Sequence, residues 1–111
     1  NDIHGHLVGD QVIKQISDIL KSNGRESDTT GRWGGEEFLI ILPHTGMKNA
    51  KEHAEKIRES INTCVFSTVK HMTCSFGVSE FNNRDTVHTL ISRADEALYR
   101  AKSMGRNRVE I

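Results

Sequence analysis

The stretch GRWGGEEFLIIL, residues 31–42, decides the fold because it joins a glycine pair to the most apolar run of the chain. Paired glycines accept the positive φ angles of a two-residue turn, so positions 34–35 predict the tip of a β-hairpin. Residues 38–42 do not alternate between apolar and polar side chains, which predicts a strand covered on both faces. Glu36 and Glu37 lie between the tip and this strand, where charge does not help burial. These two carboxylates are therefore candidates for chemistry.

Three other segments repeat apolar residues at three- and four-residue spacing, which is typical of amphipathic helices. They cover residues 12–20, 47–61 and 87–101. Gly105 follows the third segment, where a helix commonly ends in a residue with positive φ. Residues 72–78 alternate bulky with small side chains, as a strand does, and residues 107–111 are a candidate closing strand.

Helices and strands alternate along the chain, so the predicted class is α/β or α+β, with helices packed on a mostly antiparallel sheet. No segment before the first predicted helix reads as a strand, although a fold of this pattern usually has a central strand there. We therefore expect a fragment that lacks its first strand. Such a gap would expose apolar sheet surface and unpaired strand edges.

Length and composition narrow the classes of function. A chain of 111 residues is expected to form one domain. Acidic and basic residues balance at 15 each, so no overall field attracts nucleic acid or membrane, and an anion must be bound by a local cluster. No apolar run approaches the ~20 residues of a membrane span.

The cysteines and histidines do not have metal-site spacing. Cys64 and Cys74 lack the spacing of a zinc site or a redox motif, and we expect buried thiols rather than a disulfide. The six histidines are scattered, which argues against a transition-metal site.

The glycine pair and the two acids at the hairpin tip have two explanations. The turn alone requires glycine, but a tip without side chains also lets a ligand approach the backbone, as in phosphate-binding loops. Neighbouring strand residues point to opposite faces, so one salt bridge does not explain both Glu36 and Glu37. Carboxylates suit Mg²⁺, which binds hard oxygen ligands together with substrate phosphates.

Two further pairs are candidate nucleotide contacts. Lys102 and Arg106 lie at the end of the third predicted helix, where cations either offset the helix dipole or clamp a polyphosphate. Near the start, Asn1 and Asp10 have the donors and acceptors to read guanine. By itself, capping of the first helix is the better explanation for Asp10.

Together these motifs resemble the GGDEF domain of bacterial diguanylate cyclases, in its GGEEF variant, over essentially the whole chain. The resemblance rests on ND…GH…GD at 1–10, RWGGEEF at 32–38, SFGVS at 75–79, RADEALYRAK at 93–102 and GRNRV at 105–109, all in order. It implies one GGDEF domain over residues 1–111 with the nucleotidyl-cyclase-like fold. It also implies an enzyme that condenses two GTP into cyclic di-GMP and releases two pyrophosphates, in a dimer of half-sites.

The resemblance assigns roles residue by residue. The catalytic positions are Glu36 and Glu37. Glu36 matches the metal-binding acid, for which Mg²⁺ is expected, two ions per GTP, and Glu37 is the adjacent motif acid with a supporting role. The substrate-binding positions are Asn1, Asp10, Gly34, Gly35, Lys102 and Arg106. The family's first strand also carries a metal-binding aspartate that this chain lacks, so we expect that the fragment alone can be inactive.

RESD at residues 25–28 matches the RxxD inhibitory site of the family, in which Arg25 and Asp28 bind the product, with Lys56 as a further basic contact. By itself RxxD reads as a solvated charged loop. The implied partners are GTP, cyclic di-GMP, a second GGDEF domain and an upstream sensory or dimerisation domain, without nucleic acid or membrane contact. The implied location is the cytoplasm, including as the output domain of a membrane-bound sensor. The alternative is a non-catalytic receptor for cyclic di-GMP or GTP.

Overall fold

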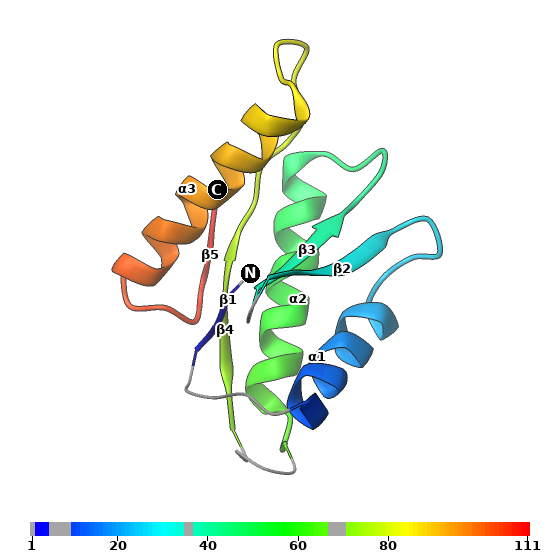
Figure 1. The fold of residues 1–111 in the computed structure, drawn as a ribbon, viewed down its shortest axis with the longest axis vertical. Coiled ribbons are helices and arrows are strands. Elements are labelled where there is room, and N and C mark those ends of the chain that lie inside the picture. The colour runs from blue at the N-terminus through cyan, green and yellow to red at the C-terminus, as the bar shows by residue number, and fades with distance from the viewer. Residues whose placement is uncertain (1, 5–9, 35–36, 67–70) are drawn as a thin grey trace.

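The structure is a computed structural model, and it describes residues 2–4, 10–34, 37–66 and 71–111. These residues form a five-stranded sheet with helices on both faces (Figure 1). The helices are α1 (Asp10–Ser22), α2 (Met47–Thr63) and α3 (Val87–Ser103). The strands are β1 (Asp2–His4), β2 (Thr29–Gly34), β3 (Glu37–Ile41), β4 (Thr73–Gly77) and β5 (Val109–Glu110). All three predicted helices and the predicted hairpin are confirmed.

The strand order in the sheet is β2-β3-β1-β4-β5. Neighbouring strands are antiparallel except β4 and β5, which are parallel. A parallel pair needs a crossover connection, and α3 supplies it. This mixed sheet with packed helices confirms the predicted α/β class.

In the hairpin, the residues before the glycine pair lie opposite the residues after it. β2 pairs with β3 from Thr29↔Ile41 to Arg32↔Phe38, and the register then shifts so that Gly34 lies opposite Glu37. The shift is a bulge-like irregularity next to the tip. The tip residues Gly35 and Glu36 lie outside the described part of the chain.

The prediction that no strand precedes the first helix is wrong. Asp2–His4 forms β1 at the centre of the sheet. It pairs with β4 through all three of its residues and with β3 at the pair Asp2↔Glu37. A segment of three residues with one apolar side chain has no detectable alternation, whereas its backbone groups can bond to a strand on either side. This strand therefore forms because its backbone pairs with neighbouring strands in the tertiary structure, and not because of a local sequence pattern.

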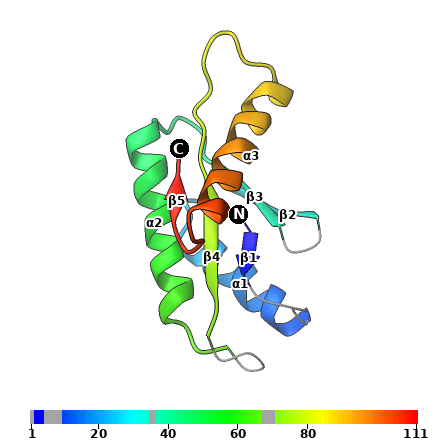
Figure 2. The same cartoon turned by 90° about the vertical axis from the view of Figure 1, so that its left-hand side faces the viewer.

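The helices cover the two faces of the sheet unequally. α1 and α2 lie on one face, and α3 lies on the other along β4 and β5 (Figures 1 and 2). The buried core lies mainly between the sheet and α1 and α2, and its members are Val12, Ile16, Leu20, Phe38, Ala54, Ile57, Ile61, Phe66, Met72, Cys74, Phe76 and Val109. No helix in the described ranges has both the length and the apolar character to cross a bilayer.

The two cysteines are free thiols, as predicted, although they are not equally covered. Cys74 is buried on β4, and Cys64 is half-buried after α2.

α3 lies directly on β4 because Gly77 has no side chain. A Cβ atom at Gly77 would lie 2.1 Å from the carbonyl oxygen of Ala94 and 2.4 Å from the backbone nitrogen of Leu98. Real Cβ atoms do not approach backbone so closely, so this glycine allows the helix to dock. The end of α3 is thereby held near the sheet.

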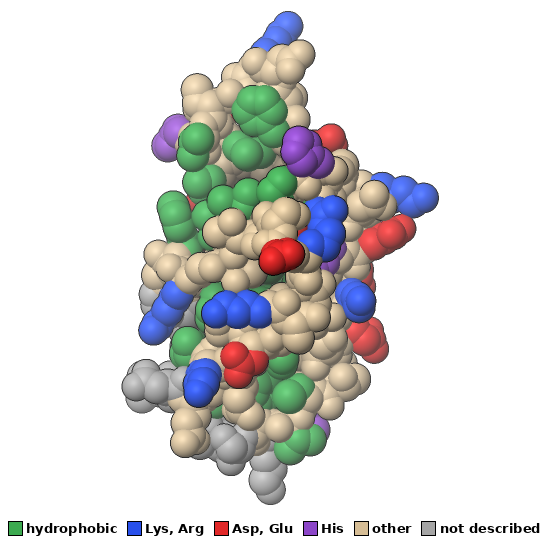
Figure 3. Space-filling model, turned by 90° about the vertical axis from the view of Figure 1, so that its right-hand side faces the viewer, with side chains coloured by type: hydrophobic (Ala, Val, Ile, Leu, Met, Phe, Trp, Pro, Cys, Tyr) green, Lys and Arg blue, Asp and Glu red, His purple; other side chains and the backbone are tan. Residues whose placement is uncertain are grey.

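The predicted covering of β3 on both faces is only half right. Phe38 is buried in the core and Ile40 packs against it, but Ile41 is 52% exposed. On the α3 side, β3 and α3 line a groove of about 720 Å³, whose walls include Trp33 and Leu90. Since α3 follows β4 and β5, it leaves the hairpin half of this face open. Figure 3 shows hydrophobic side chains gathered in the upper part of the surface on the hairpin side.

Candidate functional site

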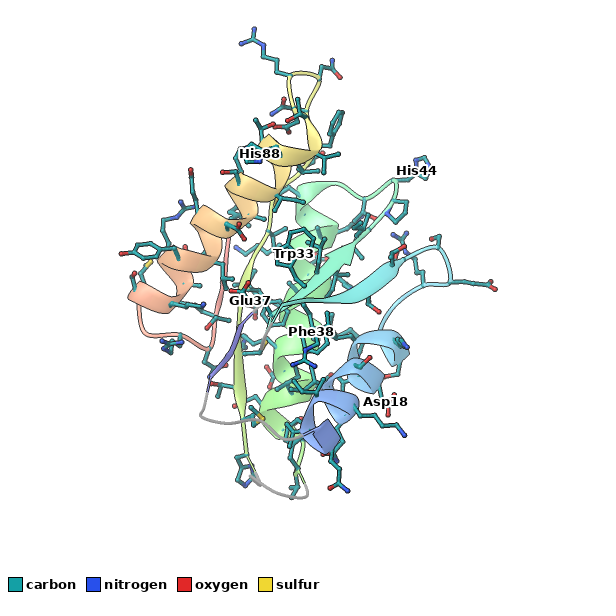
Figure 4. The ribbon with its side chains drawn as sticks, viewed as in Figure 1. Asp18, Trp33, Glu37, Phe38, His44 and His88 are labelled. Carbon is teal, nitrogen blue, oxygen red and sulfur yellow. The ribbon has the colours of Figure 1, made fainter. Side chains whose placement is uncertain are left out.

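The hairpin and the end of α3 meet in one place. Glu37 is the first residue of β3, and Lys102 lies in the last turn of α3. Lys102 Nζ is 3.8 Å from Glu37 Oε2, and both side chains are partly exposed. Figure 4 shows Glu37 in the middle of the molecule, beside α3. The structure thus brings an acid of the hairpin motif next to a cation of the predicted phosphate clamp.

The turn after α3 places Arg106 close to Lys102. Gly105 has φ 117°, as predicted for the residue that ends a helix. Its N–H donates to Lys102 O at 3.4 Å, and the N–H of Arg106 donates to Ala101 O at 2.9 Å. These two bonds form a Schellman motif, which satisfies the last carbonyls of the helix. Both predicted clamp residues therefore belong to one hydrogen-bonded turn.

Arg25 and Asp28 form an ion pair that is held by two hydrogen bonds. The N–H of Arg25 donates to Asp28 Oδ2 at 2.8 Å, and Arg25 Nη2 donates to Asp28 Oδ1 at 3.3 Å. The same guanidinium donates to Thr45 Oγ1 at 2.5 Å and to Pro43 O at 3.2 Å. The Asp28 side chain is 2% exposed while that of Arg25 is 57% exposed. A buried acid therefore holds an accessible arginine.

This ion pair lies in a pocket of about 360 Å³, whose lining residues come from the loop before β2, residues 42–45 and α2. Lys56 lines the same pocket, so the three residues predicted for the inhibitory site lie together. The full lining is Arg25, Asp28, Leu42, His44, Thr45, Asn49, Glu52, His53 and Lys56. Mixed charge in a small concave site suits a polar, charged ligand.

Sequence reasoning missed the α2 residues of this pocket other than Lys56. Asn49, Glu52 and His53 lie on the same helix at spacings that place them on one face with Lys56. Their spacing of three and four residues could therefore have predicted that these side chains share one face of α2. His53 Nε2 is buried without a hydrogen-bond partner. Burial lowers the pKa of His53 below its ordinary value of 6.5, and the nearby Asp28 carboxylate opposes this shift.

The other predicted site residues belong to the N-terminal part of the chain and to the hairpin motif. Asn1, Gly35 and Glu36 lie outside the described residues. Asp10 is the first residue of α1, and Gly34 is the last residue of β2. A Cβ atom at Gly34 would meet no atom within 4 Å, so space is open beside the backbone there. Within residues 2–4, 10–34, 37–66 and 71–111, no three His, Cys, Asp or Glu side chains gather as metal ligands.

Comparison with known proteins identifies the family. The family model described as "Diguanylate cyclase, GGDEF domain" matches residues 1–108. The chain is 44% identical to diguanylate cyclase VdcA of Vibrio cholerae, with 98% of this chain and 34% of that protein covered. It is 42% identical to diguanylate cyclase DgcM of Escherichia coli K12, with 98% and 27% covered. The chain thus spans about a third or less of these curated relatives.

Solved structures give the same family. The fold matches diguanylate cyclase SiaD of Pseudomonas aeruginosa, solved with its activator SiaC, at a TM-score of 0.84 and 38% identity over 96% of this chain and 42% of that chain. It matches the GGDEF domain of DgcB from Caulobacter crescentus, solved with c-di-GMP, at 0.86 and 31% over 96% and 66%. On the family match, the sequence identity and the shared fold, the chain belongs to the GGDEF domain family.

Proposed function

We propose that the protein is a diguanylate cyclase, which joins two GTP molecules into cyclic di-GMP and releases two pyrophosphates. The observation that carries this proposal is the approach of Lys102 Nζ to Glu37 Oε2 at 3.8 Å. It unites an acidic hairpin with a cationic helix end, the combination that a metal-bound polyphosphate needs. The relatives named diguanylate cyclases support the same reaction.

In this proposal Lys102 and Arg106 bind the terminal phosphate of GTP. Arginine offers two parallel donors and lysine a compact charge, so the pair both orients and neutralises the phosphate. Gly34 lets the nucleotide approach the hairpin because no atom lies within 4 Å of where its Cβ would be. Gly35 extends that surface, and Asn1 and Asp10 read the guanine edge.

Glu36 accepts the proton of the 3′-hydroxyl that attacks the α-phosphate of the second GTP. The displaced group is pyrophosphate, and the new bond is a phosphodiester. The role of Glu37 is to hold charge beside Glu36 and Lys102. A second GGDEF domain supplies the other GTP, so the active form is a dimer, which an upstream domain would bring together.

Magnesium fits the donor chemistry of the hairpin. Carboxylate oxygens are the protein ligands that Mg²⁺ prefers, and the Glu37 side chain is 40% exposed, so solvent and ions reach it. Glu36, with Glu37 beside it, would hold the metal, with two ions for each GTP. When bound, the metal neutralises phosphate charge and stabilises the leaving pyrophosphate.

We further propose that the pocket around Arg25 and Asp28 binds cyclic di-GMP and inhibits the enzyme. Arg25 is accessible and already oriented by a buried carboxylate, and Lys56 adds a second cation in the same pocket. A guanidinium can fork to guanine or phosphate while keeping its contact with Asp28. The DgcB structures contain c-di-GMP, which is consistent with a product site in this family.

The direct test is turnover of GTP with Mg²⁺ by the full-length protein, including the upstream domain proposed above, followed by chromatography of the products. Cyclic di-GMP and pyrophosphate are expected, and Glu36→Gln should reduce their formation at least a thousandfold, as for loss of a general base and metal ligand. Glu26→Gln, an exposed acid in the RESD loop, is the matched control and should retain activity. A protein that binds GTP normally but makes no cyclic di-GMP would contradict the proposal.

The pocket around Arg25 also favours a second candidate, a non-catalytic receptor for cyclic di-GMP. The two functions differ in turnover, since a receptor binds the dinucleotide but leaves GTP unchanged. Calorimetry with cyclic di-GMP and the turnover assay on the same sample separate them.

A further inference from the structure

The segment that follows α3 has an unusual backbone. Gly105, Arg106 and Asn107 are consecutive and have φ angles of 117°, 63° and 49°. Glycine adopts this left-handed region freely, asparagine tolerates it, and arginine adopts it at a cost in energy. A bend of this kind persists only where surrounding contacts fix it. Here those contacts are made by Asn107.

Asn107 is anchored at both its backbone and its side chain. Its N–H donates to Ser75 Oγ at 3.1 Å. Its Oδ1 accepts a hydrogen bond from Arg58 Nη1 at 3.0 Å. Ser75 is on β4 and Arg58 is on α2, so two different elements hold one loop residue.

Both anchors are themselves well fixed. Ser75 is 0% exposed. Among the residues that the structure describes, it is the one polar residue that is buried. Its partner strands, β1 and β5, lie on either side of β4. The Arg58 side chain is 17% exposed, and its guanidinium pairs with Glu55 and Glu59 at 3.3 Å each. These contacts limit the movement of both anchors.

The anchored residue is the direct neighbour of Arg106. On the other side of Arg106, the Schellman bonds tie the chain to Ala101 and Lys102. Arg106 is thus held between the helix end and Asn107, and its side chain leaves the backbone in a defined direction. Lys102 belongs to the same turn, so the backbones of the two cationic residues keep a fixed separation. A frayed helix end would not provide this.

We propose that Asn107, anchored by Ser75 and Arg58, is a positioning residue that orients Arg106 toward the terminal phosphate of GTP. This inference rests on the proposed function of Lys102 and Arg106 as a phosphate clamp. Asn107 does not itself need to touch the nucleotide. It reduces the conformational freedom that Arg106 would otherwise lose on binding, which favours triphosphate binding.

The test compares two ligands that differ only in the β- and γ-phosphates, and the γ-phosphate is the one that the clamp would hold. 3′-Deoxy-GTP and 3′-deoxy-GMP lack the attacking hydroxyl, so neither reacts, and calorimetry with Mg²⁺ gives their affinities for the protein. Asn107→Gly accepts the same backbone angles but loses the acceptor for Arg58. Arg58→Met loses the donor and keeps a chain of similar bulk. Asn62→Ala is the matched control because it changes an exposed side chain of α2 outside the Arg58–Asn107 hydrogen bond.

Asn107→Gly and Arg58→Met should each weaken 3′-deoxy-GTP binding about tenfold, while 3′-deoxy-GMP affinity changes less than about twofold. The double variant should lose no more than either single variant, because both remove one interaction. Asn62→Ala should bind both ligands as the wild type does. Thermal melts of every variant separate loss of folding from loss of positioning.

The outcomes distinguish this inference from the function on which it rests. If the wild type binds 3′-deoxy-GTP no more tightly than 3′-deoxy-GMP, the phosphate clamp and the proposed function fail together. If the wild type prefers the triphosphate and folded Asn107→Gly and Arg58→Met keep that preference, only the positioning role is overturned. Equal losses for both ligands would also overturn it, since they indicate a general structural effect.

Discussion

Gly77 of β4 lies directly against Ala94 of α3, so closely that a Cβ atom on Gly77 would be 2.1 Å from Ala94 O. The obstacle is backbone and not a flexible side chain, and the helix would have to lift from the sheet to make room. α3 also carries Lys102 and leads into Arg106, so the docking of this helix and the geometry of the candidate site depend on the same glycine.

Gly77→Ala should therefore destabilise the fold by about 3 kcal/mol, at the upper end of overpacking costs. Urea unfolding followed by circular dichroism measures the change in the free energy of unfolding. Gly31→Ala is the matched control, because a Cβ atom there meets nothing within 4 Å. Equal urea midpoints for Gly77→Ala and Gly31→Ala would show that the helix does not need this close approach.

Lys102→Met should separate binding from stability. The Lys102–Glu37 pair is partly exposed, and such pairs contribute about 0–1 kcal/mol to stability. The same lysine in a phosphate clamp would contribute much more to ligand affinity, so GTP should bind about tenfold more weakly. Calorimetry and thermal melts measure the two effects, with Lys51→Met on the exposed face of α2 as control. Unchanged GTP affinity would remove Lys102 from the clamp.

Asp28→Asn should weaken the inhibitory pocket. The carboxylate accepts two hydrogen bonds from Arg25, and an amide nitrogen in place of one oxygen cannot accept. Arg25 then loses its orientation, and cyclic di-GMP affinity should fall at least about tenfold, as for loss of a charged hydrogen bond. Progress curves of GTP turnover should consequently slow less as product accumulates.

The control for this variant is Arg84→Ala, which removes an exposed cation from the loop before α3. It should leave product inhibition intact. If Asp28→Asn shows the same product inhibition as the wild type, the pocket around Arg25 is not the inhibitory site.

His53 should make stability depend on pH. Burial holds its folded-state pKa below the ordinary value of 6.5, so between the two values the unfolded chain binds more protons than the folded one. Stability therefore rises with pH through this window and is lost as the pH falls below 6.5. Urea unfolding between pH 5 and pH 8 should show a smaller dependence in His53→Gln than in the wild type. His88→Gln, at an exposed position on α3, is the control.

The elements with long periodic patterns could be predicted from the sequence. Ala50, Ala54, Ile57 and Ile61 repeat with helical spacing, and all four are buried in α2. Val87 shows the limit of this reasoning. It fits the apolar pattern of α3 but is 75% exposed at the first residue of the helix, where it lines the groove between α3 and β3.

Other features depend on the arrangement of elements and could not be predicted from local patterns. β1 exists because neighbouring strands offer partners on both sides, and three residues carry no periodic signal of their own. The meeting of Glu37 with Lys102 follows from the strand order and from the path of α3. The family resemblance implied that these residues share a site, while residue spacing alone did not. His53 belongs to a face of α2 that spacing could have revealed.

The pairing of β1 with its two neighbours has a mechanical consequence. Among the described residues, β1 pairs with β4 along its whole length and with β3 at Asp2↔Glu37. Within that part of the chain, the hairpin therefore joins the rest of the sheet at one pair, and Glu37 belongs to it. Rocking of the hairpin would sweep its far end, where Thr29 follows Asp28 of the pocket, through a wide arc. The acid beside Lys102 would scarcely move, as a point near the fulcrum of a lever does.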